Sequence, residues 1–296
     1  MDSIRCSLGI MAHNEEANIG RLLARVRASH LQRVDVAEIV VVASGCTDRT
    51  EEIVREAAAV DERIFLISQP TREGKASAMN LFLGHSQCDV LILSSADLLP
   101  AEDALERLVA PFADPEIGMT ASRPEPVNDP STFMGFAAHL LWDLHHLMNI
   151  NGFKAGEMIA FRKVFERIPP HTAVDEASVE PLIRGQGYMV RYVPDAIVYN
   201  KGPETVDDFL RQRRRIYAGH LEMKDLLGYA VSTMSGTKIA GLLLRNLDWR
   251  PKQLYWTARV VVLEMVGRYL GRRDYKARRS HTVWEIAAST KELETK

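Results

Sequence analysis

The chain has 296 residues, which allows one large domain, or one domain with a sizeable extension, around an ample hydrophobic core. Its hydrophobic fraction of 46% and charged fraction of 26% are ordinary for a soluble globular protein. The net charge of −2 gives no overall electrostatic attraction to nucleic acid, and no recognised nucleic-acid-binding module accompanies the basic residues near the C-terminus. We therefore expect no nucleic-acid partner.

The cysteines and the apolar runs indicate the cellular compartment. Cys6, Cys46 and Cys88 are odd in number and lie in or beside apolar segments, so we expect buried free thiols in a reducing compartment. The first residues lack the positive start and long apolar core of a signal peptide. The apolar runs are far shorter than the ~18–20 residues of a membrane-spanning helix. These features predict a cytoplasmic protein, compatible with a peripheral position on the inner face of a membrane.

Strand, polar turn and helix alternate along the first part of the chain. Apolar segments rich in β-branched residues predict strands at 7–12, 38–43, 63–67 and 89–94, and helical patterns follow them. Asn14 is a plausible N-cap of the first helix, and Pro100 is expected to open a helix over 101–112. The alternation predicts an α/β fold with a Rossmann-like, mostly parallel sheet flanked by helices.

The second part of the chain changes in character toward its end. We predict strands near 117–122, 158–162 and 188–198, a proline-rich connection at 124–130, and a long helix that starts near Phe133. A basic helix is predicted over 204–226, and two more helical stretches are separated by Trp249-Arg250-Pro251. The predicted organisation is a core domain at 1–230 and an amphipathic helical C-terminal extension at 231–296.

Polar segments follow the predicted strands or open the predicted helices. They are residues 12–16 (AHNEE), 42–50 (VASGCTDRT), 72–80 (REGKASAMN), 95–97 (SAD), 174–177 (VDEA) and 212–216 (QRRRI). In this order they resemble the motifs of the inverting, nucleotide-sugar-dependent glycosyltransferases of family 2. The resemblance covers residues 4–225, about three quarters of the chain. It implies the GT-A fold, a nucleotide-sugar donor and transfer of a sugar to an acceptor.

The first two segments are the ones that the resemblance places against the donor nucleotide. Segment 12–16 resembles the A-Y-N-E-E motif, which implies that His13, Asn14 and Glu15 lie against the base and ribose. Segment 42–50 resembles V-D-D-G-S-T-D-G-T, but Ala43 and Ser44 replace both leading aspartates, which puts UDP in doubt as the nucleotide. Ser44 and Asp48 could still bond a base or ribose. As plain helix caps, Asn14 and Asp48 would need no ligand.

The next two segments carry the residues expected at the diphosphate. Segment 72–80 resembles G-K-x-x-A-x-N, and Lys75 after Gly74 can neutralise diphosphate charge near a helix start. Ser95, Ala96 and Asp97 stand where the family has D-x-D, with Ser95 in place of the first aspartate. The resemblance implies that Asp97 binds a divalent metal, Mg²⁺ or Mn²⁺, which accepts few protein ligands and keeps water or phosphate oxygens.

The last two segments carry the candidate base and acceptor-side residues. Asp175 and Glu176 resemble the acidic pair of the family's T-E-D-A motif in reversed order, and one of them would deprotonate the acceptor. Which of the two acts stays open, and both could instead complement a helix dipole. Segment 212–216 resembles Q-x-x-R-W, which implies that Arg215 meets diphosphate and Gln212 faces the acceptor. Ile216 replaces the tryptophan that would stack on sugar, which argues against a processive polysaccharide synthase.

The remaining features leave alternatives open. His139, His145 and His146 lack a completing acid or cysteine, so we interpret them as packing or surface residues, and His220 could reach the site. The aromatic and basic residues of 236–279 suit a peripheral membrane contact next to a lipid-linked acceptor, or packing on the core, or a homodimer contact. A degenerate GT-A scaffold that binds without turnover is the alternative function. A nucleotidyltransferase would need a glycine-rich loop after the first strand, which is missing.

Overall fold

The computed structural model describes residues 3–150, 152–169, 175–228 and 236–279, together with positions 290 and 293. The strands of this part of the chain form one eight-stranded sheet in the order β3-β2-β1-β4-β7-β6-β8-β5. They are β1 (Ile4–Ala12), β2 (Val34–Ser44), β3 (Ile64–Gln69), β4 (Val90–Ser95), β5 (Leu99–Pro100), β6 (Ile117–Pro126), β7 (Ile159–Arg162) and β8 (Met189–Asn200). Only β7 and the short β5 run against the common direction. The predicted α/β fold with a mostly parallel sheet is confirmed.

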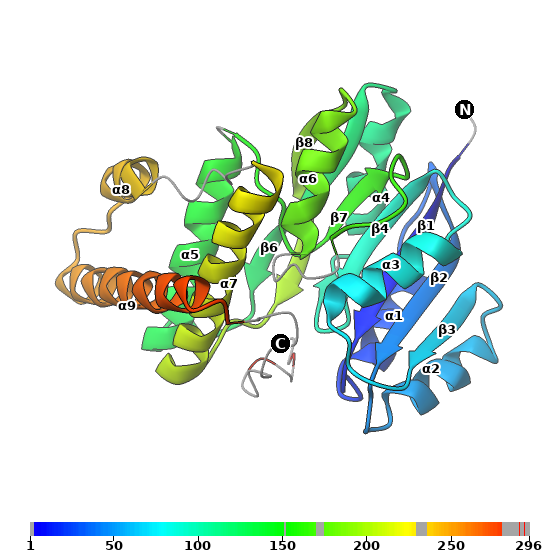
Figure 1. Ribbon diagram of the computed structural model, residues 1–296, viewed down its shortest axis with the longest axis horizontal. Helices are drawn as coiled ribbons and strands as arrows, with labels where there is room; N and C mark the ends of the chain where they lie inside the picture. Colours follow the sequence, from blue (N-terminus) through cyan, green and yellow to red (C-terminus); the bar gives the residue numbers. More distant parts are fainter. Residues whose placement is uncertain are drawn as a thin grey trace.

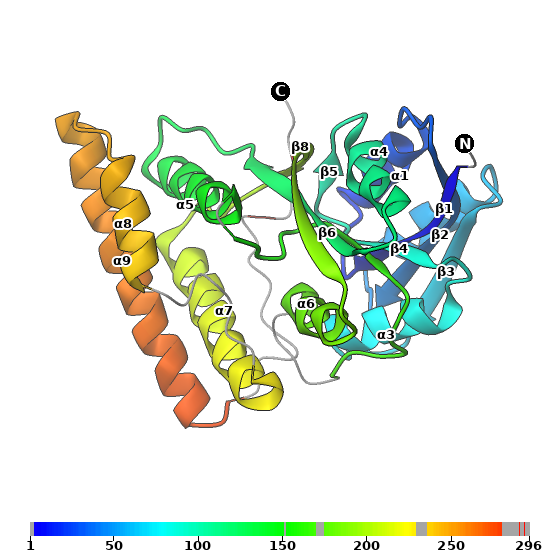
Figure 2. The same ribbon diagram turned by 90° about the horizontal axis from the view of Figure 1, so that it is seen from above.

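Helices cover both faces of this sheet (Figures 1 and 2). They are α1 (Ile19–Arg27), α2 (Thr50–Ala58), α3 (Lys75–His85), α4 (Ala104–Val109), α5 (Phe133–Ile150), α6 (Asp175–Gly185), α7 (Val206–Leu227), α8 (Gly236–Arg245) and α9 (Pro251–Lys276), with a 3₁₀ turn at Ala110–Ala113. Side chains of a strand alternate between faces, so β2 supplies both cores. Ile39 and Val41 pack with α1 on one face, and Val40 and Val42 pack with α3 on the other.

Three local predictions about the elements are wrong, and pairing between distant segments explains two of them. Leu99 and Pro100 form β5 by pairing with β8, so the next helix begins only at Ala104. Strand β6 continues through Pro124 and Pro126, which were predicted to lie in a connection. Beyond Ala121 the edge of β6 that faces β7 has no paired strand, so a proline there, which has no N–H, removes no hydrogen bond from the sheet. Asn14 does not cap α1, whose N-cap is Asn18; it adopts a left-handed φ of 52°.

The predicted free thiols are confirmed. Cys6 and Cys88 are buried and Cys46 is partly exposed, and all three are unbridged. Burial raises the pKa of the Cys6 thiol far above its usual range, so this group stays protonated and behaves as a small apolar side chain.

The C-terminal helices pack beside α5 rather than on the sheet (Figure 2). Helix α9 lies close against α7 because two glycines of α9, which have no side chain, leave room for α7. A Cβ on Gly267 would meet the Cβ of Arg213 at 2.7 Å, and a Cβ on Gly271 would meet the backbone oxygen of Arg214 at 2.5 Å. No helix among the described segments has the length and apolar character needed to cross a bilayer.

Candidate functional site

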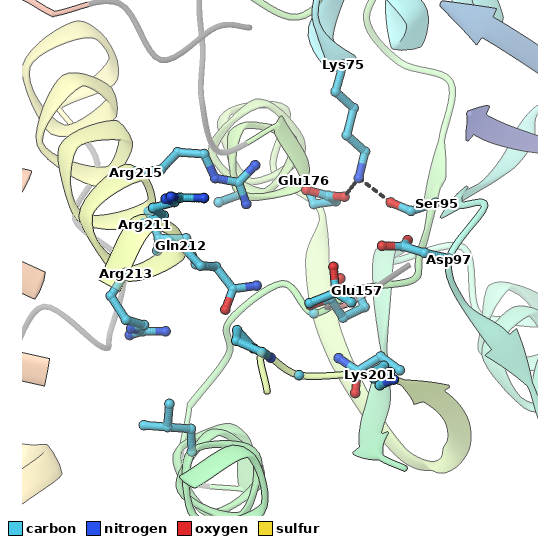
Figure 3. A pocket seen from close by; sticks show the side chains of 18 of the residues that line it. Lys75, Ser95, Asp97, Glu157, Glu176, Lys201, Arg211, Gln212, Arg213 and Arg215 are labelled. Carbon is cyan, nitrogen blue, oxygen red and sulfur yellow. Dashed lines mark hydrogen bonds and ion pairs between the residues drawn. The ribbon is translucent and has the colours of Figure 1, made fainter. Parts of the chain in front are cut away.

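A cleft of about 760 Å³ opens at the carboxyl ends of β1, β2 and β4 and extends toward α5, α7 and α9 (Figure 3). Ligands of open α/β sheets bind at this edge, where the turns after neighbouring parallel strands meet. Many of the residues predicted for the site line the cleft: His13, Glu15, Ser44, Lys75, Ser95, Asp97, Glu176, Gln212 and Arg215. The motifs that are separated along the chain therefore converge on one surface.

Lys75 lies at the centre of the cleft, at the first residue of α3. Gly74 precedes it with a φ of 94°, which a residue without a side chain adopts most easily, and this turn aims Lys75 across the sheet edge. Its Nζ donates to the Ser95 Oγ over 2.6 Å and forms an ion pair with the Glu176 carboxylate (Figure 3). The Lys75 and Glu176 side chains are only 13% and 19% exposed. One ammonium thus links three predicted motifs.

Carboxylates gather next to this ammonium. Asp97 follows β4 and points toward the same space as Glu157 and Glu176 (Figure 3). Its carboxylate accepts no hydrogen bond from the described residues. Burial, together with the negative charges of Glu176 and Asp97, raises the pKa of Glu157 to about 7. Three carboxylates therefore lie near one another in this part of the cleft, although no group of three or more His, Cys, Asp or Glu among the described residues is arranged to hold a metal ion.

The turns after β1 and β2 hold each other in place. The His13 Nδ1 lies 2.6 Å from the backbone oxygen of Ser44, and the Asn14 Oδ1 accepts from the backbone N–H of Thr47 over 2.8 Å. Asp48 accepts hydrogen bonds from the Thr50 hydroxyl over 2.6 Å and from the Glu16 N–H over 3.1 Å. These hydrogen bonds hold the pKa of Asp48 below its usual value although burial opposes ionisation.

Some predicted residues lie behind the cleft surface. Asn14, Asp48 and Ala96 lie outside its described lining, with Ala96 buried and its N–H donated to the Met11 oxygen over 3.1 Å. Asp175 begins α6, and its side chain lies outside the described part of the structure. Asn14 and Asp48 lie on the two turns after β1 and β2, and their hydrogen bonds between these turns support the lining residues His13, Glu15 and Ser44.

Helix α7 presents its basic residues in two directions. Gln212 and Arg215 extend into the cleft, as does Arg211 (Figure 3). Arg213 also reaches the cleft lining but pairs with Glu264 over 2.6 Å, and Arg214 pairs with Asp274 on α9. Two of the four arginines therefore connect α7 to α9.

Two family models account for most of the chain. Residues 7–180 match the model described as glycosyl transferase family 2, and residues 183–270 match glycosyl transferase family group 2. The chain belongs to glycosyl transferase family 2. The resemblance stated from the motifs is thereby confirmed.

Relatives and solved structures agree with this membership. The chain is 26% identical to the probable glycosyltransferase YdaM of Bacillus subtilis, an alignment that covers 73% of this chain and 55% of YdaM. It is 25% identical to the poly-beta-1,6-N-acetyl-D-glucosamine synthase of Staphylococcus aureus, covering 76% and 56%. The chain thus spans about half the length of these curated relatives.

Among solved structures, the mannosyltransferase PcManGT of Pyrobaculum calidifontis, in complex with GDP-Man and Mn²⁺, has a TM-score of 0.68. It is 19% identical, and the match covers 94% of this chain and 88% of PcManGT. The glucosyl-3-phosphoglycerate synthase of Mycobacterium tuberculosis, in complex with Mn²⁺, UDP and phosphoglyceric acid, has a TM-score of 0.53 at 20% identity, covering 77% and 80%. These similarities confirm the GT-A fold of this family 2 member.

The sequence analysis missed several residues of the cleft. Glu157, Lys154 and Lys201 line it and stand in none of the motif segments. Arg72 also lines it and begins segment 72–80, but no role was predicted for it. Arg72 comes close because the turn at Gly45, with a φ of 59°, touches the backbone of residues 71–72: a Cβ there would meet the Arg72 nitrogen at 2.5 Å. The one available signal for Glu157 was an acidic residue next to a glycine just before a predicted strand.

The histidines fit the packing interpretation only in part. His139 contacts the Asn128 oxygen at 2.9 Å and His146 contacts the Tyr192 hydroxyl at 2.8 Å, so both are structural. His145 is buried but also lines the cleft, and burial lowers its pKa to about 3. His220 lines the cleft as well, as anticipated.

Proposed function

We propose that this family 2 member transfers a sugar from a nucleotide-sugar donor to an acceptor, with inversion at the anomeric carbon. The observation that carries the proposal is the convergence of Lys75, Asp97 and Glu176 in one cleft at the sheet edge. These residues supply a cation for diphosphate, a metal ligand and a base, which are the groups that such a transfer needs. The GDP-Man and UDP complexes of the structural neighbours support a nucleotide donor.

In this proposal the donor binds across the ends of β1, β2 and α3. His13, Glu15 and Ser44 line the cleft next to each other and would contact the base and ribose. Asn14 and Asp48 would act by holding that surface in shape, through their hydrogen bonds to Thr47 and Thr50. Lys75, at the N-terminus of α3, and Arg215 would meet the diphosphate, since cations and a helix N-terminus both favour phosphate.

The residues present fit a divalent metal held mainly by the donor. Asp97 has a carboxylate without a hydrogen-bond donor among the described residues, and burial together with the nearby carboxylates of Glu176 and Asp97 raises the pKa of Glu157 to about 7. Ser95 cannot replace an aspartate as a charged ligand, and its hydroxyl already accepts from Lys75. When bound, Mg²⁺ or Mn²⁺ neutralises charge on the leaving diphosphate. Asp97 would therefore anchor the ion, and phosphate oxygens and water would complete its coordination.

Glu176 is the proposed base. Its side chain enters the cleft from the first turn of α6 and reaches Lys75, which stands at the expected diphosphate position. As the base, this carboxylate would take the proton from an acceptor hydroxyl that attacks the anomeric carbon from the side opposite the diphosphate. Inversion follows because one displacement by the deprotonated acceptor replaces the leaving group. The degenerate-scaffold alternative is not favoured, because candidates for the base, the cation and the metal ligand all line the same cleft.

A screen of donors tests the proposal directly. We expect one of UDP-, GDP-, dTDP- or CDP-sugars to raise the melting temperature by several degrees when Mn²⁺ is present and much less without it. A ligand at about 100 times its Kd adds about 2.7 kcal/mol to the free energy of unfolding. The measurement is a thermal-shift titration of the full chain, followed by a transfer assay with the donor that binds. Equal, small shifts with every nucleotide, with and without Mn²⁺, would refute the proposal.

We further propose that the acceptor is lipid-linked and that α9 lies against the inner face of a membrane. Tyr255, Val262, Val266 and Tyr269 recur at helical spacing on α9 and are 62%, 53%, 39% and 63% exposed. They form an apolar stripe on the helix that lies at the outer edge of the molecule (Figure 2). Basic residues of the same helix, among them the exposed Arg272, suit anionic lipid headgroups.

Replacing Tyr255 and Tyr269 together with Ser is expected to reduce binding to vesicles that contain an anionic lipid by about tenfold, because two interfacial aromatic rings are lost. The measurement is co-sedimentation of the full chain with these vesicles. The control replaces the exposed Val60 and Phe65, on the far side of the sheet, with Ser and should leave pelleting unchanged. Unchanged pelleting of the tyrosine variant, together with loss of a dimer in light scattering, would favour a homodimer contact instead.

A further inference from the structure

The end of the cleft farthest from the sheet contains a second charged cluster, to which the proposed chemistry assigns no role. It consists of Lys154 in the loop after α5, Arg213 and His220 on α7, and Glu264 and Arg268 on α9, all of which line the cleft. We call these five residues the distal cluster. They belong to three elements that pack together as a bundle, whereas the donor residues stand on the sheet edge (Figure 2).

The distal cluster has excess positive charge. Glu264 accepts from Arg213 over 2.6 Å and from Arg268 over 2.8 Å, so one carboxylate faces two guanidinium groups. Burial opposes ionisation of Glu264, but the two arginines outweigh it and hold its pKa at about 2. The Lys154 ammonium adds a further charge, and burial together with Arg213 lowers its pKa to about 8, so it stays largely charged at pH 7. Among the five residues of the cluster, three therefore carry a positive charge and one a negative charge, and Glu157 is a further acid near Lys154.

His220 supplies an independent sign of a missing ligand. It is only 6% exposed, and its Nδ1 atom is buried with no hydrogen-bond partner among the described residues. Burial, and the neighbouring cations Lys154 and Arg213, keep its pKa well below the usual value, so the ring is neutral. Buried polar atoms without partners are uncommon because each costs about 1–3 kcal/mol. An atom of this kind beside excess positive charge indicates a site for an anion.

We propose that the distal cluster is an acceptor subsite that binds a phosphate group of the acceptor. The inference rests on the proposed transfer function and adds the class of acceptor. The donor diphosphate has its own partners at Lys75 and Arg215, so a second phosphate is the ligand left for Lys154 and His220. Between the two ends, the cleft wall carries the apolar side chains of Leu141, Trp142 and Met148 from α5, which suit the uncharged body of the acceptor.

Sulfate binding tests the subsite without any need for turnover. Sulfate is used because it mimics a phosphate monoester and, unlike inorganic phosphate, does not precipitate Mn²⁺. With GDP or UDP and Mn²⁺ in excess to fill the donor site, we expect calorimetry to detect one further sulfate site on the full chain. Lys154→Met should weaken it at least tenfold and His220→Phe about threefold, because a charged and a neutral hydrogen bond are lost.

Lys276→Met is the matched control, since it removes the same charge from an exposed position at the end of α9. It should change sulfate affinity less than twofold. Equal weakening by Lys154→Met and Lys276→Met would show only a general charge effect and would overturn the proposal, as would wild-type affinity in both the Lys154 and His220 variants.

Competition with sulfate distinguishes a lipid phosphate from a soluble sugar phosphate as the natural ligand. Farnesyl phosphate that displaces sulfate identifies a lipid-linked acceptor, and glucose 6-phosphate that does so identifies a soluble sugar phosphate. If neither displaces sulfate, the subsite does not serve an acceptor. A sulfate site that persists in a chain without any nucleotide affinity would leave the subsite intact and refute the transfer function instead.

Discussion

Glu176→Gln is expected to lower kcat for sugar transfer about 10³-fold without weakening donor binding, since the variant no longer competes with the diphosphate for the Lys75 ammonium. The amide keeps the size of the side chain but cannot take the proton from the acceptor hydroxyl, and a positioned base contributes about 10²–10⁴-fold. Glu176 pairs with Lys75 inside the cleft, so the substitution removes a carboxylate that stands next to the expected diphosphate position. The measurement is steady-state transfer with the donor found in the screen, together with NMR assignment of the anomer formed.

Three further variants show whether the effect belongs to Glu176 itself. Glu56→Gln, an exposed change of the same kind on α2, should retain full activity. Asp175→Asn should retain more activity than Glu176→Gln, and Glu157→Gln should retain base function because Glu157 stands on the Asp97 side of the cleft (Figure 3). If Glu176→Gln kept more than about a tenth of the activity while one of the others lost it, the base would be reassigned.

Asp97→Asn is expected to remove the Mn²⁺-dependent part of donor binding and to lower kcat/KM about 10²–10³-fold. The amide is a poor ligand for a hard cation, and Ser95 offers no second carboxylate to compensate. The comparison of thermal shifts with and without Mn²⁺ at fixed donor concentration measures the first effect. Asp89→Asn is the control, because Asp89 is exposed at the opposite end of the same strand. A full Mn²⁺ response in Asp97→Asn would place the metal elsewhere.

The first half of the fold was predictable because its signals are local. Strands β1 to β4 are apolar runs, and the polar residues of the turn after each strand can be recognised from the local sequence. Where parallel strands lie side by side, those turns must meet, so the association of Lys75, Ser95 and Asp97 followed from the predicted sheet.

The missed features depend on pairing between segments far apart in the chain. Glu157 reaches the cleft because β7 pairs antiparallel with β4, which lies about seventy residues earlier, and no local pattern specifies that pairing. The distal cluster requires α9 to approach α7 closely, which depends on Gly267 and Gly271 facing that helix. The sequence alone does not show which helix packs against a glycine within a helix. The sequence therefore predicted which residues line the cleft at the sheet edge better than those at its far end.

The ion pair between Lys75 and Glu176 has a consequence for the order of events in turnover. While the two side chains remain paired, the carboxylate is neutralised and an acceptor that enters first finds no free proton acceptor. In the proposed function, a donor diphosphate would compete for the same ammonium and so release the carboxylate when the sugar is in place. We therefore expect a compulsory sequence in which the donor enters before the acceptor, and the enzyme is protected from activating stray hydroxyl groups while it waits.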